Sequence, residues 1–112
     1  MRKKIPFIKR YHKLKLDVFT TIRGKTWMKK FKVGEVVDCE TPDGTFAVRV
    51  EAMDAAKIKD MTLEFLKADA EHKGCTFGCK DDFVNLLNSF RDPRWQQATL
   101  DSEMTILTLR KL

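Results

Sequence analysis

A hairpin signal decides the fold, and it lies in residues 36–52, which read VVDCETPDGTFAVRVEA. Pro42 presets the backbone of the first turn position, and Gly44 accepts a positive φ at the end of the turn. After the turn, apolar residues alternate with small or charged ones, as expected for a strand with one buried face. The stretch therefore predicts two antiparallel strands, over residues 36–41 and 46–52, joined by a tight turn.

Further elements are predicted on both sides of this hairpin. From period-two and helical spacing of apolar residues we expect, in order, a strand over residues 17–23, a basic loop over 24–32, helices over 60–70 and 80–90, and a closing strand over 104–109. Asp60 is the expected N-cap of the first helix, and Asp92-Pro93 is expected to end the second. Short strands combined with two helices predict an α+β fold built on a small β-barrel with two or three flanking helices.

Length and composition predict one globular domain. The chain has 112 residues, of which 43% are hydrophobic and 34% charged, and it contains no repeat and no linker rich in Pro, Gly or Ser. These values are typical of a packed domain rather than a disordered chain. We therefore expect residues 1–112 to form a single domain, which we take to be a monomer.

Cysteine use and hydropathy indicate a cytoplasmic protein with no membrane partner. No apolar run approaches the ~20 residues of a transmembrane helix, and basic residues interrupt the segment that follows the N-terminus. An odd number of cysteines, three, argues against a secreted disulfide scaffold.

Positive charge is concentrated in the first third of the chain. Residues 1–34 carry twelve Lys or Arg and one acid, whereas residues 35–112 carry ten Lys or Arg and fifteen acids. Such a block attracts phosphates through Coulomb forces and counterion release, provided that it gathers along one wall of the folded domain. The alternative is a solvated basic face with no dedicated partner.

A family resemblance rests on two motifs. Thr21-Ile22-Arg23 is followed by a basic spacer and then by the segment FKVGEVV over residues 31–37. This pattern resembles the ASCH domain, a branch of the PUA-like superfamily, in motif over residues 18–37 and in layout over most of the chain. The resemblance implies a PUA-like small β-barrel with a cleft flanked by helices, and a role in RNA binding.

One hydrolytic branch of that family removes the acetyl group from acetylated cytidine. Its pattern has a Lys three residues before a strand Thr, and a Glu at the start of a helix. Thr21 matches the Thr and is the one catalytic candidate, but Val18 occupies the Lys position and cannot act as a base. Nearby substitutes are Lys15 or Lys25 for the lysine, and Glu71, Asp81 or Asp82 for the acid. The missing lysine favours a protein without this activity.

The candidate RNA-binding residues combine cations, hydroxyls and an aromatic ring. Cations hold the backbone of a single strand, and aromatic faces stack its bases. The candidates are Lys13, Lys15, Thr20, Arg23, Lys25, Trp27, Lys29, Lys30 and Lys32. In the competing interpretation Trp27 caps the barrel, the lysines solvate a loop, Thr20 serves strand propensity and Arg23 pairs with an acid such as Glu35.

No cofactor or metal is expected. The sequence has no Gly-rich phosphate loop, nucleophile elbow or paired-His motif. His72, Cys75 and Cys79 are weak metal candidates, because their spacing matches no established zinc pattern. Three hypotheses follow: RNA binding without chemistry, hydrolysis of a modified nucleoside, and an interaction module whose basic face docks an acidic protein.

Overall fold

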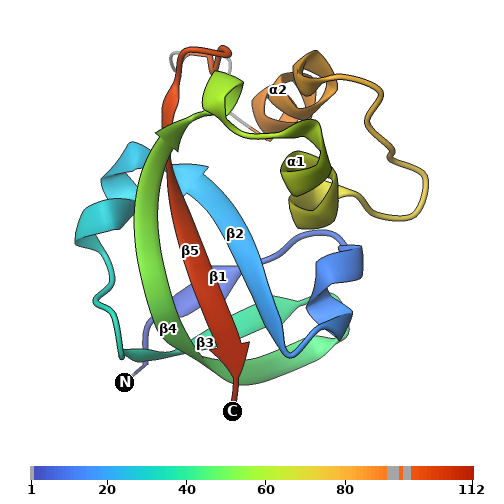
Figure 1. Cartoon of the computed structure of the whole chain (residues 1–112). Coiled ribbons are helices and arrows are strands. Elements are labelled where there is room, and N and C mark those ends of the chain that lie inside the picture. Colours follow the sequence, from blue (N-terminus) through green and yellow to red (C-terminus); the bar gives the residue numbers. More distant parts are fainter. Residues whose placement is uncertain (1, 91–93, 95–96) are drawn as a thin grey trace.

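A curled five-stranded sheet forms the body of the computed structural model, which describes residues 2–90, 94 and 97–112 (Figure 1). Its strands lie in the order β1 (Lys4–Pro6), β3 (Val36–Thr41), β4 (Gly44–Lys57), β5 (Glu103–Lys111) and β2 (Val18–Gly24). β1 is parallel to β3, and the other neighbours are antiparallel. The predicted strands are thus present, and the three-residue edge strand β1 was not predicted.

The predicted hairpin is confirmed. β3 and β4 pair with Thr41 opposite Gly44, and Gly44 has a φ of 131°, which favours glycine. The Thr41 hydroxyl donates to the Gly44 carbonyl over 2.8 Å and accepts the N–H of Asp43, so the turn carries its own hydrogen bonds.

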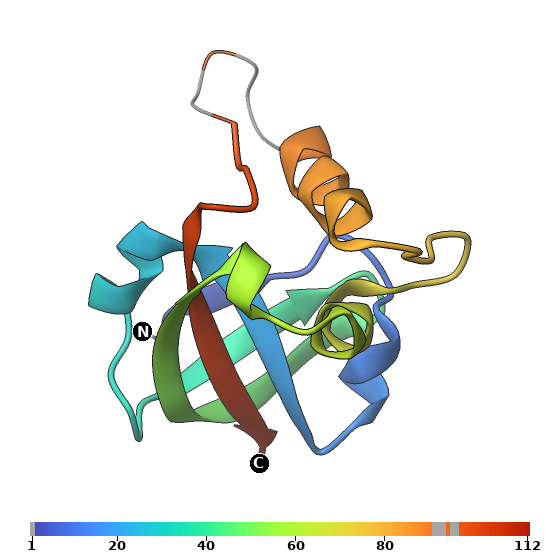
Figure 2. The same ribbon diagram turned by 45° about the horizontal axis from the view of Figure 1, so that its top comes forward.

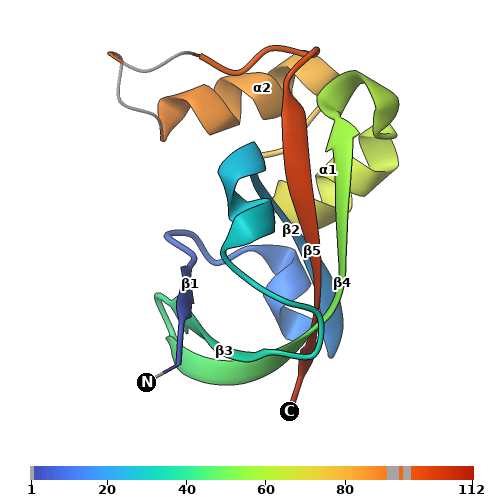
Figure 3. The ribbon, with the colours of Figure 1, turned by 90° about the vertical axis from the view of Figure 1, so that its left-hand side faces the viewer.

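β4 is longer than predicted because its second half pairs with β5. A register shift between Val50 and Ala52 marks a bulge, after which the strand continues to Lys57 beside β5. A bulge bends a strand and increases its twist. The sheet consequently curls into a half-barrel whose two edges are β1 and β2 (Figure 3). The α+β class and the barrel-like shape expected from the sequence are confirmed.

Two α-helices lie together at the end of the molecule opposite both termini (Figures 1 and 3). α2 (Lys80–Ser89) begins where predicted, while the role of Asp92-Pro93 falls outside the described residues. α1 (Leu63–Ala70) begins later than predicted, and the assignment of Asp60 as its N-cap was wrong. Asp60 belongs to a short 3-10 helix, η3 (Ile58–Asp60), and the Thr62 hydroxyl caps α1 by accepting the Phe65 N–H over 3.1 Å.

Two more 3-10 helices precede and follow β2. η1 (His12–Lys15) leads into the strand, and η2 (Lys25–Lys29) occupies part of the predicted basic loop. η1, drawn in blue, and η2, drawn in cyan, lie at opposite ends of β2 (Figures 1 and 2). Basic segments that are close in sequence are therefore separated by the length of β2.

The core has two parts, one on each face of the sheet. Inside the half-barrel lie Ile5, Phe7, Phe19, Phe31, Val37, Cys39, Val48, Val50, Leu107 and Leu109. Between the sheet and the helices lie Ile22, Ile58, Met61, Leu66, Ala70, Phe77, Phe83 and Met104. β2 contributes Phe19 to the first and Ile22 to the second, so side chains of this strand reach both compartments.

Candidate functional site

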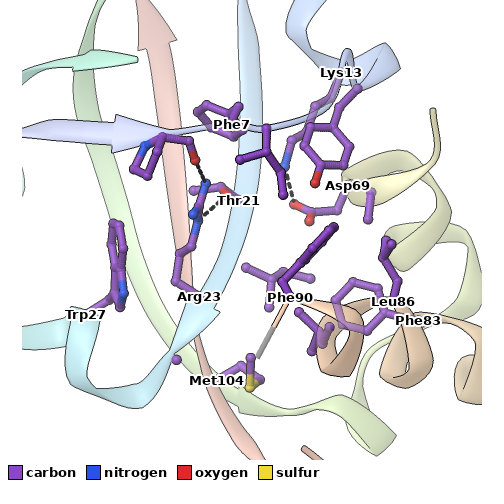
Figure 4. A pocket seen from close by; sticks show the side chains of 17 residues that line it. Phe7, Lys13, Thr21, Arg23, Trp27, Asp69, Phe83, Leu86, Phe90 and Met104 are labelled. Carbon is purple, nitrogen blue, oxygen red and sulfur yellow. Dashed lines mark hydrogen bonds and ion pairs between the residues drawn. The ribbon is translucent and has the colours of Figure 1, made fainter. Parts of the chain in front are cut away.

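A cavity of about 570 Å³ lies between β2 and α2, where the two edges of the sheet approach each other (Figure 4). We call it the central cavity. Its volume falls within the roughly 300–1,000 Å³ typical of small-molecule sites. It is lined by Pro6, Phe7, Ile8, Tyr11, Lys13, Thr21, Ile22, Arg23, Gly24, Trp27, Asp69, Ala70, Phe83, Leu86, Leu87, Phe90 and Met104.

An ion pair is buried in one wall of the central cavity. The Lys13 Nζ lies 3.3 Å from the Asp69 Oδ1, and each side chain is 4% exposed. The Thr20 hydroxyl donates to the same carboxylate oxygen over 2.8 Å. Burial disfavours the ammonium and lowers the pKa of Lys13, while the negative charge of Asp69 opposes that shift. η1, β2 and α1 thus each supply one member of this group.

Aromatic rings surround the Lys13 ammonium on its other sides. Its Nζ lies 5.3 Å from the ring centroids of both Phe7 and Tyr11, within the range of cation–π attraction. Burial raises the pKa of Tyr11, and the positive charge of Arg23 counteracts this rise. The phenol therefore stays neutral and able to donate a hydrogen bond at neutral pH.

Arg23 links the two edges of the half-barrel. Its Nη2 donates to the Pro6 carbonyl at the end of β1 over 2.7 Å, and its Nε donates to the Thr21 hydroxyl over 3.0 Å. The guanidinium carbon lies 4.9 Å from the Phe7 ring centroid and 5.0 Å from that of Trp27. Burial lowers the pKa of Arg23, and Asp69 opposes the shift. Arginine nevertheless remains charged, so the cavity contains two cations and one carboxylate.

α2 supplies the apolar wall of the cavity. Its residues Phe83, Leu86 and Leu87 line the space together with Phe90, which follows the helix. These four residues form the apolar stripe predicted from the sequence, at positions i, i+3, i+4 and i+7. Phe83 is fully buried against Phe77, whereas Phe90 is exposed at the rim.

Comparison with known proteins reveals one relative across nearly the whole chain. The chain is 37% identical over 110 residues to "Uncharacterized protein MJ0364" of Methanocaldococcus jannaschii, a match that covers 96% of this chain and 95% of the relative. The chain belongs to the family of that archaeal protein. No protein-family model and no solved structure matches the sequence.

In this member of the family, four of the ten predicted site residues line the central cavity: Lys13, Thr21, Arg23 and Trp27. Thr20 lies behind the cavity wall and contacts it through Asp69. Lys25, Lys29, Lys30 and Lys32 are exposed on or after η2, and Lys15 is exposed on η1. The cavity therefore brings together the arginine, one lysine and the aromatic ring, and leaves the other lysines outside.

The gathering of the early cations along one wall stays a prediction, and of these cations Lys13 and Arg23 line the central cavity. Besides the separation of η1 from η2, several of them pair with acids of β3 and its neighbouring turns. The pairs are Arg2–Asp38, Lys3–Glu35, Lys4–Glu40 and Arg10–Asp43, at 2.8–3.8 Å. Exposed pairs of this kind contribute only about 0–1 kcal/mol each, but they reduce the net positive field of the N-terminal segment.

The lysine and the acid of the cavity are not the substitutes that the family resemblance suggested. Neither Lys15 nor Lys25 lines the cavity, and Lys13 supplies the buried cation. Of the predicted acids, Glu71 accepts the Phe77 N–H, Asp82 accepts N–H groups before α2, and Asp81 is exposed. The acid in the cavity is Asp69, which sequence reasoning missed. Its position three residues after Leu66 and beside Ala70, on the buried face of α1, was the available signal.

The weak metal candidates have structural contacts of their own. The His72 ring packs edge-on against Tyr11 with centroids 5.3 Å apart, and its backbone pairs with that of Cys75. Cys79 is the N-cap residue of α2. Within the described ranges, no group of three or more His, Cys, Asp or Glu residues is arranged to hold a metal ion. No helix among these residues is long and apolar enough to span a membrane.

Proposed function

We propose that the protein binds RNA and takes one nucleobase into the central cavity. The observation that carries the proposal is the buried Lys13–Asp69 pair, set in a cavity whose other walls are largely aromatic and aliphatic. A base has two flat apolar faces and a polar edge, and the cavity offers a matching surface to each.

Stacking supplies affinity in this proposal. Phe7, Tyr11, Trp27 and Phe90 surround the space with aromatic surface. Stacking of a base on an aromatic side chain is worth about 1–3 kcal/mol. A cavity of about 570 Å³ has room for a ring system of this size together with part of its sugar.

The polar groups of the cavity supply orientation. An ammonium donates and a carboxylate accepts, so Lys13 and Asp69 offer adjacent donor and acceptor atoms to a base edge. Arg23 adds a guanidinium that already stacks between Phe7 and Trp27. The resemblance of residues 18–37 to the ASCH domain supports the same assignment, because that family's expected layout has a barrel and helices on either side of a cleft.

The test fills the mouth of the cavity without touching its polar groups. Ile8 lines the cavity but is 61% exposed, so Ile8→Trp is expected to fold and to block entry. Leu16→Trp is the matched control, because Leu16 is 56% exposed and does not line the cavity. Fluorescence anisotropy with single-stranded RNA, and calorimetry with nucleoside monophosphates, should show at least about a tenfold loss for Ile8→Trp alone. Equal affinities for the two variants would refute the proposal.

Hydrolysis of a modified nucleoside is the second candidate. It is favoured by a lysine whose pKa is lowered by burial, because such a lysine gives up its proton more readily, and by the Thr21 hydroxyl in the same cavity. For acetylated cytidine, water adds to the acetyl carbonyl carbon, the carbon–nitrogen bond breaks, and acetate and cytidine are released. Chromatography of that reaction should show turnover in the native protein and in Thr21→Ser, and loss in Thr21→Ala. No turnover above blank would end this candidate.

A further inference from the structure

A second hollow, of about 580 Å³, lies on the far side of η1 from the central cavity. It is formed by η1, the β3–β4 turn, the end of β5 and the loop after α1. We call it the basic groove, after its cations Arg10, Lys15, Lys73 and Lys111.

The charge of the basic groove is strongly positive. Asp43 is the one carboxylate among its lining residues, and the Arg10 Nε binds it over 2.8 Å. Within the part of the chain that the structure describes, Lys15 and Lys73 form no ion pair. His12 also lines the groove.

Lys111 is held in place at the floor of the groove. Its Nζ donates to the Leu14 carbonyl over 2.6 Å and lies 5.1 Å from the Phe46 ring centroid. Its side chain is half-buried, unlike the exposed lysines around it. A cation whose position is fixed before binding loses less conformational freedom when it meets an anion.

Tyr11 joins the groove to the central cavity, because this residue lines both. On the cavity side its ring packs edge-on against Phe7, with centroids 6.2 Å apart. A strand that leaves a base in the cavity can therefore cross Tyr11 and continue directly into the groove.

We infer that the basic groove binds phosphate groups of the nucleotides adjacent to the one held in the central cavity. This inference rests on the proposed function and adds the path of the RNA backbone, which runs past η1 rather than along η2. Lys15, Lys73 and Lys111 make the phosphate contacts, and Phe46 offers a ring beside them.

The test compares three double variants that each remove two positive charges. Lys15→Ala with Lys73→Ala empties the groove of its free lysines, Lys25→Ala with Lys29→Ala changes η2, and Lys57→Ala with Lys67→Ala alters exposed sites outside both hollows. The groove variant should bind single-stranded RNA about tenfold more weakly than the Lys57/Lys67 variant, and its slope of log affinity against log salt should be smaller by about 1.4. Identical affinity and slope for these two variants, or a loss confined to the η2 variant, would overturn the inference.

Nucleoside monophosphates separate this inference from the proposed function. The groove variant should bind them as the native protein does, whereas Ile8→Trp should not bind them. If the native protein binds RNA in a groove-dependent way but binds no mononucleotide, the cavity proposal fails and the groove stands. If mononucleotides bind and the groove variant retains native RNA affinity and salt slope, the groove inference fails and the cavity stands.

Discussion

The two short basic helices beside β2 have similar composition and opposite surroundings. η1 reads HKLK and places Lys13 in a buried ion pair, whereas η2 reads KTWMK and buries none of its residues. The difference comes from α1, which supplies Asp69 opposite η1, whereas among residues 2–90, 94 and 97–112 no carboxylate forms an ion pair with Lys25 or Lys29 of η2. A lysine becomes part of a cavity wall only where a distant segment provides its counter-charge.

The energetics of burial explain why this partner is required. An ammonium removed from water without a partner costs several kcal/mol, and a well-placed carboxylate offsets most of that cost. The Thr20 hydroxyl bonds to the carboxylate as well, and the described residues contain no buried side-chain N or O atom without a hydrogen-bond partner. The exposed lysines of η2 remain hydrated, so they contribute to long-range attraction and little to stability.

Removal of one member of the buried pair should have the largest effect. Asp69→Ala is expected to lower the free energy of unfolding by about 3–5 kcal/mol, because it leaves the Lys13 ammonium buried without its counter-charge. Lys25→Ala combined with Lys29→Ala should change it by about 0.5 kcal/mol or less. Urea denaturation measures both.

A double variant separates the charge from the packing. Lys13→Met combined with Asp69→Leu replaces the ion pair with apolar side chains of similar volume, and should regain most of the stability that Asp69→Ala loses. A loss as large as that of Asp69→Ala would mean that the pair itself, rather than the orphaned charge, stabilises the fold.

Arg23→Lys should have a smaller effect. It keeps the positive charge but loses the planar group that bonds Pro6 and Thr21 and stacks on two rings, so we expect a loss of about 1–3 kcal/mol in unfolding free energy. Arg49→Lys, at an exposed position of β4, is the matched control and should be nearly neutral. Thermal denaturation compares the two variants, and equal shifts in their melting temperatures would contradict the bridging role of Arg23.

The pH dependence of stability should distinguish Lys13 from exposed lysines. Burial lowers the pKa of Lys13 in the folded state. At a pH between this lowered pKa and the ordinary pKa of lysine, the unfolded chain keeps a proton on Lys13 that the folded chain has released. The unfolding free energy of the native protein relative to Lys13→Met should therefore rise as the pH approaches that value. Urea denaturation at a series of pH values measures this difference in unfolding free energy. A difference that becomes smaller as the pH rises would contradict a lowered pKa of Lys13.

Local patterns predicted much of the fold. The Pro42-Asp43-Gly44 turn and the start of α2 follow from short-range rules, and the structure agrees with both. The N-cap of α1 was misplaced because Asp60 and Thr62 are both good capping residues, and η3 occupies the first of them. The edge strand β1 is too short to produce a pattern of its own.

The candidate site was only partly predictable, because its decisive contacts join segments far apart in sequence. Thr21 was identified from the family resemblance, Arg23 and Trp27 from the combination of cations with an aromatic ring, and Lys13 as an RNA contact rather than as a member of a buried ion pair. Asp69 was missed, since its partner lies in η1, a segment whose alternating lysines and leucines showed no sign of burial. The acids that pair with the N-terminal cations were not predicted either, because they also lie far from their partners in the sequence.

The most direct test of the nucleobase proposal is to locate an RNA base relative to the cavity walls. Isotope-edited NMR on the complex with a short single-stranded RNA would record contacts between base protons and the methyl groups of Thr21, Leu86 and Met104. The account predicts such contacts from one nucleotide of the strand. Contacts confined to the exposed face of η2, with these three methyl signals unchanged, would contradict it.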